Sequence, residues 1–452
     1  MKRNVDATKG PLFSMILVYT IPLIISTIMQ HMFEIVDKAV LGNMADTVAV
    51  ASVGATGSIS ALIINGFVGL SAGTSIVLAR FLGQKNEEKI RTTIDSALIS
   101  GIVFGAVVAV VGVILAPTFL RLTACPAECF DGALLYIRIY ISAAPATLLY
   151  NYGSSILRAL GDTQRPLTYI MISGVVNLIL NVILCIVLPQ KVAAVAIATV
   201  ASKIIGAVLV VNRLCHLEGV ARVTLRKLRF TFEALWRILR FGIPSAISNL
   251  LLPLANLQIV SAINSFGVDA VAGQSASSSI NNIAHAVTGG FGAATTVFMG
   301  QNIGAEKPER VKKAFWYCMG LGTVLGGIFG YLTILTGRLT LGLVVGFGAT
   351  AAIEYGMIRM FYVAQFMWVN GIVNVLGSSL HAYGYPFFGS ISSVLFTLGF
   401  RIFWMRLIYP LNPTFNMVMA CFTVSWFLNM AFYIVSVAII TRRYNKGIYK
   451  KI

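Results

Sequence analysis

Gly69-Leu-Ser-Ala-Gly-Thr-Ser-Ile-Val-Leu-Ala-Arg-Phe-Leu-Gly83 is the stretch that decides the fold, because a related stretch occurs a second time in the chain. Its counterpart is Gly290-Phe-Gly-Ala-Ala-Thr-Thr-Val-Phe-Met-Gly-Gln-Asn-Ile-Gly304, and the displacement is the same at both ends. Two flanking motifs repeat with almost the same displacement, Ile21-Pro22 with Ile243-Pro244 and Gly161 with Gly384. A displacement that stays nearly constant along the chain indicates an internal duplication rather than chance recurrence of glycine and proline.

The composition is that of a membrane protein. Hydrophobic residues make up 57% of the chain and charged residues only 11%, whereas a soluble domain has about 25% charged residues. A lipid-facing surface explains the deficit, because charge is costly there. The formal net charge of +18 would indicate nucleic acid in a soluble protein. Membrane proteins instead collect Lys and Arg in cytoplasmic loops, so we expect the lipid bilayer and no nucleic acid as partner.

Twelve segments are apolar over about 20 residues, the length that a helix needs to cross a bilayer. Six lie in each copy of the repeat, and an even number gives both copies the same orientation. We therefore predict an all-α membrane protein with twelve transmembrane helices in two parallel-repeat six-helix lobes. The predicted parts are an N-lobe at 1–215, a cytoplasmic linker at 216–235 and a C-lobe at 236–452. The expected spans are 13–38, 50–79, 94–118, 133–157, 167–188, 192–212, 241–264, 272–300, 314–336, 355–380, 386–409 and 415–441.

Lys and Arg are divided unequally between the two sides of this topology. Twenty-five lie in the two terminal tails and the junctions on the same side, against three in the opposite loops. Four more, Lys38, Arg138, Arg359 and Arg406, are placed near the outer ends of spans. By the positive-inside rule, we expect both termini to be cytoplasmic. We also expect a multi-pass protein of the plasma membrane. The polar, basic start of the chain shows no signal-peptide pattern and is expected to stay in the cytoplasm.

Asp37 is the first candidate for chemistry, because ionisable residues inside spans are functional by default. Gln30 lies seven residues before Asp37 on the same helix face, and Glu34 lies between them. Two carboxylates one turn apart in a low dielectric suit the binding and release of H⁺ or Na⁺. The alternative is that Asp37 is an interfacial residue tied to the neighbouring Lys38.

Other polar residues inside spans are weaker candidates. Asn177 and Asn181 are four residues apart on one face of the fifth span, and Asn151 and Thr199 lie in the fourth and sixth. Each of them alone is more typical of hydrogen bonding between helices than of a binding site. Tyr136 is a candidate for the wall of an apolar cavity, among aromatic residues that mostly pack against lipid or core.

Two further groups are expected to have structural roles. His31 and His285 are expected to be packed or interfacial, and Arg401 and Arg406 in the eleventh span to snorkel to an interface. Cys125 and Cys129 form the only close cysteine pair, and no second pair or histidine partner completes a metal site. We therefore predict no metal and no cofactor.

With these features the chain resembles the multidrug and toxic compound extrusion (MATE) transporters along nearly its whole length. Each matching motif is short, but their order and spacing, together with the twelve-span repeat, make the match specific. The motifs are Ile21-Pro22 followed by Ile35-Val36-Asp37 and Gly42, the Gly83-Gln-Lys-Asn-Glu-Glu junction, Leu157-Arg-Ala-Leu-Gly-Asp162 with Pro166, Asn177-Leu-Ile-Leu-Asn181, and Gly300-Gln-Asn-Ile-Gly304.

The resemblance implies a V-shaped pair of lobes that exports amphipathic, often cationic, compounds in exchange for H⁺ or Na⁺. The substrates would be small-molecule xenobiotics or metabolites, and we expect a monomer. The family's N-lobe coupling site would contain Asp37, Asn177, Asn181 and Thr199. Gln30 and Asn151 would lie at polar positions of that lobe's cavity, and Pro22 would bend the first helix.

This chain departs from the family pattern in its acids. Some relatives have a second aspartate where this chain has Asn181, and others have acids inside the C-lobe. Here the corresponding C-lobe spans contain only neutral candidates, Asn256, Gln258, Asn370 and Asn374. Coupling therefore depends on Asp37, with Glu34 as the other candidate, and the choice between H⁺ and Na⁺ stays open.

Three rival functions are less well supported. A lipid or lipid-linked-oligosaccharide flippase of the same superfamily would have a charged central cavity and often extra spans. A membrane-embedded enzyme would need a catalytic motif, and the chain has no HExxH and no paired histidine cluster. An ion channel would not need two equivalent lobes. We therefore predict a transporter and not an enzyme.

Overall fold

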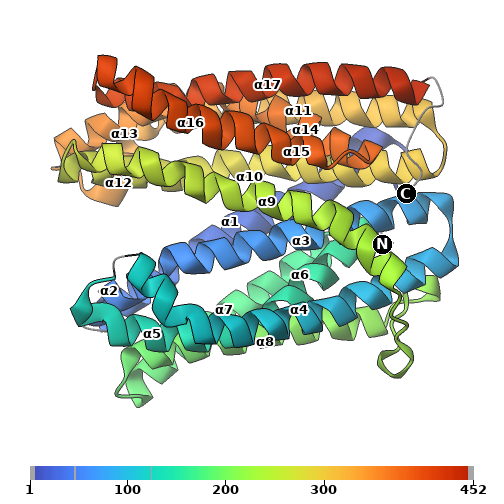
Figure 1. Ribbon diagram of the computed structural model, residues 1–452, viewed down its shortest axis with the longest axis horizontal. Coiled ribbons are helices and arrows are strands. Elements are labelled where there is room, and N and C mark those ends of the chain that lie inside the picture. Colours follow the sequence, from blue (N-terminus) through green and yellow to red (C-terminus); the bar gives the residue numbers. More distant parts are fainter. Residues whose placement is uncertain (1–5, 45–46, 124, 446–452) are drawn as a thin grey trace. The chain divides into compact units, whose positions relative to one another are not determined.

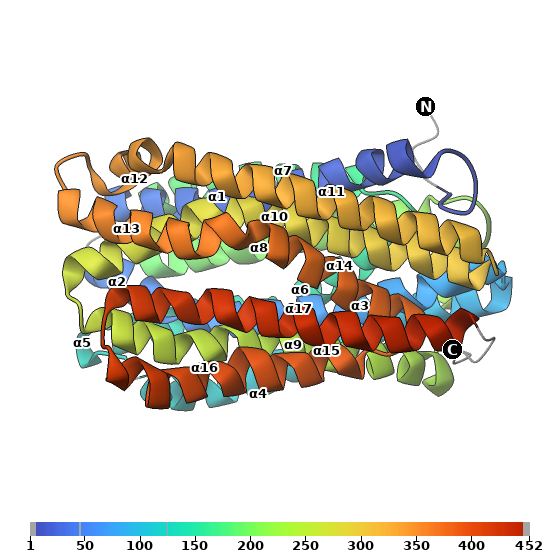
Figure 2. The same ribbon diagram turned by 90° about the horizontal axis from the view of Figure 1, so that it is seen from above.

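The structure is a computed structural model. It describes the backbone of residues 6–44, 47–123 and 125–445, and the side chains of these residues except 34–39, 41, 43, 47, 252, 257 and 258. Every regular element in these ranges is helical, and the long helices of each half lie roughly side by side (Figures 1 and 2).

Eight helices form the first half of the chain. They are α1 (Leu12–Met44), α2 (Thr47–Ala55), α3 (Gly57–Gln84), α4 (Glu87–Leu122), α5 (Ala127–Ser142), α6 (Ala144–Ala159), α7 (Gln164–Val187) and α8 (Lys191–Cys215). The connection that follows has two short 3₁₀ turns, η1 (Gly219–Ala221) and η2 (Leu225–Lys227).

The second half is more broken. Its α-helices are α9 (Phe232–Asn264), α10 (Val268–Gly304), α11 (Pro308–Leu335), α12 (Gly337–Val345), α13 (Thr350–Val363), α14 (Met367–Tyr383), α15 (Phe387–Ser392), α16 (Phe400–Phe403) and α17 (Phe415–Asn445). Short 3₁₀ turns occur at η3 (Ala364–Phe366) and η6 (Tyr409–Leu411). Two π-helical stretches, η4 (Ser393–Gly399) and η5 (Trp404–Ile408), flank α16.

All twelve predicted spans fall on helices. Within the described residues, ten helical segments are long and apolar enough to cross a membrane, or eleven if α5 and α6, which meet at a 46° bend, form one span. The remaining predicted span, 272–300, lies in the 37-residue α10, which is long enough but richer in Ser, Asn and Gln. The prediction of an all-helical, multi-pass membrane protein is confirmed.

The chain forms two compact units whose borders lie inside helices. Among the described residues, one unit contains Ile25–Ala246 and the other contains Asp6–Ile24 with residues 247–445. The borders therefore lie in α1 and α9, each a few residues after a copy of the repeated Ile-Pro motif. The first part of each of these helices packs with the unit formed by the other half of the sequence.

Repeated glycines explain this exchange. A Cβ on Gly69 of α3 would collide with the backbone of Ser245 and Ala246 in α9. A Cβ on the equivalent Gly290 of α10 would lie 2.8 Å from Ile24 Cγ1 in α1. Small residues let helices approach closely in a membrane, where packing rather than the hydrophobic effect drives association. The two copies of the repeated glycine motif thus also form the packing surfaces for these helices, with α9 packing on α3 and α1 packing on α10.

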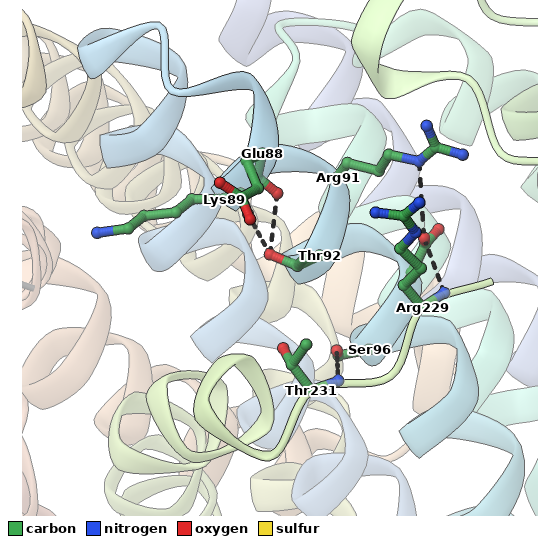
Figure 3. A network of polar contacts seen from close by, with 8 residues as sticks. Glu88, Lys89, Arg91, Thr92, Ser96, Arg229 and Thr231 are labelled. Carbon is green, nitrogen blue, oxygen red and sulfur yellow. Dashed lines mark hydrogen bonds and ion pairs between the residues drawn. The ribbon is translucent and has the colours of Figure 1, made fainter.

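Polar side chains bind the backbone segment that precedes each of the two exchanged helices, α9 and α1. In the first unit, Asp95 and Ser96 of α4 hold the residues that precede α9 (Figure 3). The backbone N–H of Arg229 donates to Asp95 Oδ2 at 3.1 Å, and that of Thr231 donates to Ser96 Oγ at 3.1 Å. The segment is therefore held through its N–H groups by acceptors.

In the second unit, the segment 7–10 before α1 is held in the opposite sense. The Arg310 guanidinium of α11 donates to the carbonyls of Ala7, Lys9 and Gly10 at 3.0–3.1 Å. Asn302 Nδ2 donates to the Ala7 carbonyl at 2.9 Å. This segment is therefore held mainly through its carbonyl groups by donors.

Asp6 begins this second segment and is stabilised as a carboxylate. Burial disfavours its charge, but Thr8 donates to Asp6 Oδ1 from its backbone N–H at 2.9 Å and from its hydroxyl at 2.6 Å. These bonds and the charges of Lys9 and Lys307 outweigh burial and lower the pKa of Asp6 below its ordinary value.

Candidate functional site

Helix α1 carries four of the residues predicted to be functional. Pro22 is buried inside the continuous helix Leu12–Met44, and Gln30 is exposed. The side chains of Glu34 and Asp37 lie outside the described residues, although their backbone belongs to α1. Their predicted coupling role stays a prediction.

Helix α7 presents its polar residues to the protein interior. Asn177 and Asn181 are 5% and 0% exposed, and Asn181 Nδ2 donates to Asn177 Oδ1 at 3.2 Å. By contrast, Ile179 and Ile183 of the same helix are about half exposed. The polarity of α7 is therefore inverted relative to a helix of a soluble protein, because its apolar face is exposed to lipid and its polar face is buried. The two neutral amides lie inside the lobe, where they can orient a charged group.

Thr199, Asn151 and Tyr136 lie on the helices around α7. Thr199 Oγ1 donates to the Val195 carbonyl of its own helix at 2.9 Å, and Asn151 Nδ2 donates to the Thr147 carbonyl at 2.8 Å. These bonds within α8 and α6 use one donor of each side chain and leave oxygen lone pairs for other partners.

Tyr136 is buried in α5 with its ring stacked on Tyr140, at 5.9 Å between centroids. Lys203 Nζ of α8 lies 5.0 Å from the centroid of the Tyr140 ring. Sequence reasoning missed Lys203, although a lysine in the middle of an apolar segment, one turn from Thr199, was a visible signal.

One expectation for an arginine was wrong. Arg401 was expected to snorkel to an interface but is 2% exposed, and Arg359 is likewise buried, at 6% exposed. Arg406, one turn after Arg401, is exposed. The span is apolar on all sides, so its sequence did not show which face turns inward.

Other residues of the C-lobe form a neutral polar cluster. Asn370 Oδ1 accepts hydrogen bonds from Thr288 Oγ1 at 2.8 Å and Asn374 Nδ2 at 2.9 Å. The His285 ring packs edge-on against Trp426, with centroids 5.8 Å apart. This packing agrees with the expectation that His285 is a packed residue.

The MatE family model matches residues 22–183 and again residues 244–404. The chain belongs to the MatE family of multidrug and toxic compound extrusion transporters. The two matches begin at the two prolines of the repeated Ile-Pro motif, in agreement with the duplication seen in the sequence.

Relatives and solved structures agree with this assignment. The MatE chain is 24% identical over 392 residues to the probable multidrug resistance protein YoeA of Bacillus subtilis, covering 85% of this chain and 84% of that one. It is 25% identical over 323 residues to an FAD transporter of Shewanella oneidensis, covering 70% of each. A crystal structure of MATE in complex with MaL6 has the same fold, with a TM-score of 0.89 at 20% identity over 98% of this chain and 100% of that one.

Proposed function

We propose that this MatE transporter is a cation-coupled antiporter of the plasma membrane that exports amphipathic, often cationic, small molecules. Multidrug resistance and export proteins among its relatives support efflux. The observation that carries coupling is the inverted polarity of α7, because its buried amides share a unit with the acids of α1. The charge asymmetry of the loops supports cytoplasmic termini. The working unit is proposed to be a monomer.

Asp37 is proposed to be the coupling residue, with Glu34 as the second candidate. In a site of low dielectric, the amides of Asn177 and Asn181 and the hydroxyl of Thr199 would orient a carboxylate and add oxygen ligands for Na⁺. Proton binding would instead neutralise the carboxylate and remove its need for these partners. Either event shifts the lobe between two arrangements only if the ion binds them unequally. Because one acid is proposed to suffice, we favour H⁺ over Na⁺.

Transport in proteoliposomes under one gradient at a time tests this proposal. We expect a pH gradient alone to drive uphill accumulation of ethidium, an amphipathic cation. Accumulation driven by a Na⁺ gradient alone would show that the ion is Na⁺. If neither gradient drives uphill transport, coupled antiport is wrong, and equilibration of a fluorescent lipid between leaflets would then favour the flippase alternative.

A further inference from the structure

Two arginines are buried in the interior of the unit that contains residues 247–445. Arg359 lies on α13 and Arg401 on α16, and they are 6% and 2% exposed. Both guanidinium groups lie against the ring of Phe422 on α17, with their carbon atoms 5.9 and 4.7 Å from the ring centroid. Three helices thus bring two positive charges to one aromatic ring.

Neutral side chains satisfy these guanidinium groups only in part. Arg401 Nη1 donates to Asn256 Oδ1 at 2.6 Å, and Arg359 Nη1 donates to Ser277 Oγ at a long 3.4 Å. The Nε atoms of both arginines are buried and have no hydrogen-bond partner among the described residues. Because a guanidinium has five N–H donors, most of the donors of this pair have no acceptor among the described residues.

In the described part of this unit, no carboxylate compensates the two charges. Among the described residues neither arginine forms an ion pair with an acid, and the four Asp and Glu side chains of the unit's long segment are all exposed. Those four are Asp269, Glu306, Glu309 and Glu354. A buried charge without a counter-charge costs several kcal/mol in a protein interior. Cation–π contact with Phe422 offsets only about 2 kcal/mol of such a cost.

Further unsatisfied polar atoms lie on the neighbouring α10. Asn281 is fully buried, and neither of its amide atoms has a partner among the described residues. Asn281 lies one turn after Ser277 on the same face of α10. Gln274 lies one turn before Ser277, and its buried Oε1 also has no hydrogen-bond partner among the described residues. Native structures leave few buried polar groups unpaired, so such a concentration indicates a missing ligand or water.

The backbone around Arg401 is also unusual. The four-residue α16 that carries it lies between the π-helical stretches η4 and η5. Short π-helical insertions in α-helices occur frequently at functional sites, because they redirect side chains that a regular helix would place elsewhere.

We propose that Arg359 and Arg401, with Asn256, Ser277 and Asn281, form a binding site for the carboxylate or phosphate group of an amphipathic anion. Guanidinium groups match the geometry of oxyanions, and a bound anion would use the free N–H donors and compensate both charges. Phe422, Trp426 and Phe415 belong to the apolar cluster of the same unit and suit the apolar part of such a ligand.

The substrate class follows if the proposed efflux function is correct. Exported compounds would then include anionic or zwitterionic amphipaths, and not only cations. The site itself does not depend on coupling, because it is assembled from residues of a single unit.

Binding to the purified full-length protein in phosphatidylcholine nanodiscs, without any gradient, tests the site. The probes are octanoate, octylammonium and octanol, which share a tail and differ in charge, and the readout is the shift in thermal midpoint with probe concentration. We expect octanoate alone to stabilise the protein. Arg359→Gln and Arg401→Gln should each weaken octanoate binding about tenfold or more, through lost charge-assisted hydrogen bonds. The exposed Arg406→Gln is the matched control and should bind octanoate normally.

A purely structural role is distinguished by Arg401→Met. This change removes an uncompensated buried charge at similar volume, so the ligand-free variant should be at least as stable as the unchanged protein while losing the response to octanoate. A large loss of ligand-free stability that Arg401→Lys restores would overturn the proposal, as would octanoate binding that neither glutamine variant weakens.

The source of the anionic group is distinguished by lipid composition. If octanoate stabilises the protein in phosphatidylcholine, the site takes a free solute. If only phosphatidylglycerol nanodiscs give an arginine-dependent stabilisation, the same site takes a lipid headgroup. Because no transport is measured, loss of the coupling proposal would leave these results unchanged, and Asp37→Asn should still respond to octanoate.

Discussion

The two lobes are built from equivalent helices but place cations and aromatic rings on different spans. In the first unit, the half-buried Lys203 on the sixth span lies over Tyr140 on the fourth. In the second unit the cations are on the tenth and eleventh spans, and the ring, Phe422, is on the twelfth. The duplicated scaffold therefore retains helix packing and leaves the interior chemistry of each lobe free to diverge.

The same contrast appears where the exchanged helices begin. The segment 229–231 is held through its N–H groups by Asp95 and Ser96, whereas the segment 7–10 is held through its carbonyls by Arg310 and Asn302. The two segments precede equivalent helices of the repeat, yet their holders have opposite polarity. A backbone segment has both N–H donors and carbonyl acceptors, so it can be held either by acceptor side chains or by donor side chains.

The largest expected effect tests whether ion coupling belongs to one lobe and anion binding to the other. Asp37→Asn should reduce gradient-driven ethidium transport to the level of empty liposomes, because the amide cannot exchange a proton near neutral pH. Octanoate binding should be unchanged, because that site lies in the other unit. Asp131→Asn, which changes an exposed carboxylate, is the matched control.

Two outcomes would change this division. Full uphill transport by Asp37→Asn together with its loss in Glu34→Gln would assign coupling to Glu34. Loss of octanoate binding in Asp37→Asn would show that the two interiors do not act separately.

An intermediate effect is expected from overpacking one glycine contact in each lobe. In Gly273→Ala, the new methyl group would meet the backbone of α13, with Gly356 N at 2.8 Å. In Gly105→Ala, it would meet the backbone of α6, with Pro145 N at 2.8 Å. Each variant should lose about 1–3 kcal/mol of stability, measured as a lower thermal midpoint.

Only Gly273→Ala should also weaken octanoate binding, because α13 carries Arg359. Gly105→Ala is its control, since α4 and α6 belong to the other unit. Equal octanoate binding by the two variants, at equal loss of stability, would contradict the assignment of Arg359 to the site.

The smallest effects are expected at the held segments, measured by amide hydrogen exchange. Asp95→Ala removes the acceptor of the Arg229 N–H, so that amide should exchange faster, as expected for a lost bond worth about 1–3 kcal/mol. Arg310→Gln should accelerate exchange at Ala7 less, because Gln301 Oε1 still accepts the Ala7 N–H at 3.0 Å.

Exposed neighbours provide the controls for this pair. Glu88→Ala on α4 and Lys312→Gln on α11 should leave exchange at both segments unchanged. A larger acceleration at Ala7 than at Arg229 would show that the carbonyl-held segment depends on its arginine more than the geometry indicates.

The candidate coupling site could be predicted only in part. Asn177 and Asn181 were found because they lie four residues apart in an apolar span, and their mutual hydrogen bond follows from that spacing on a helix. Lys203 was visible in the sequence but was not recognised. The arginine site could not be predicted, because its members come from five helices between residues 256 and 422.

The sequence by itself determined the class of protein, the order of its spans and their duplication. Lipid as solvent demands long apolar helices, and a repeated glycine motif remains visible at a constant displacement. Only the tertiary structure decided that α1 and α9 are exchanged between the units and that Arg359 and Arg401 lie inside. A span that is apolar all round does not specify which face is buried, so the packing of neighbouring helices makes that choice.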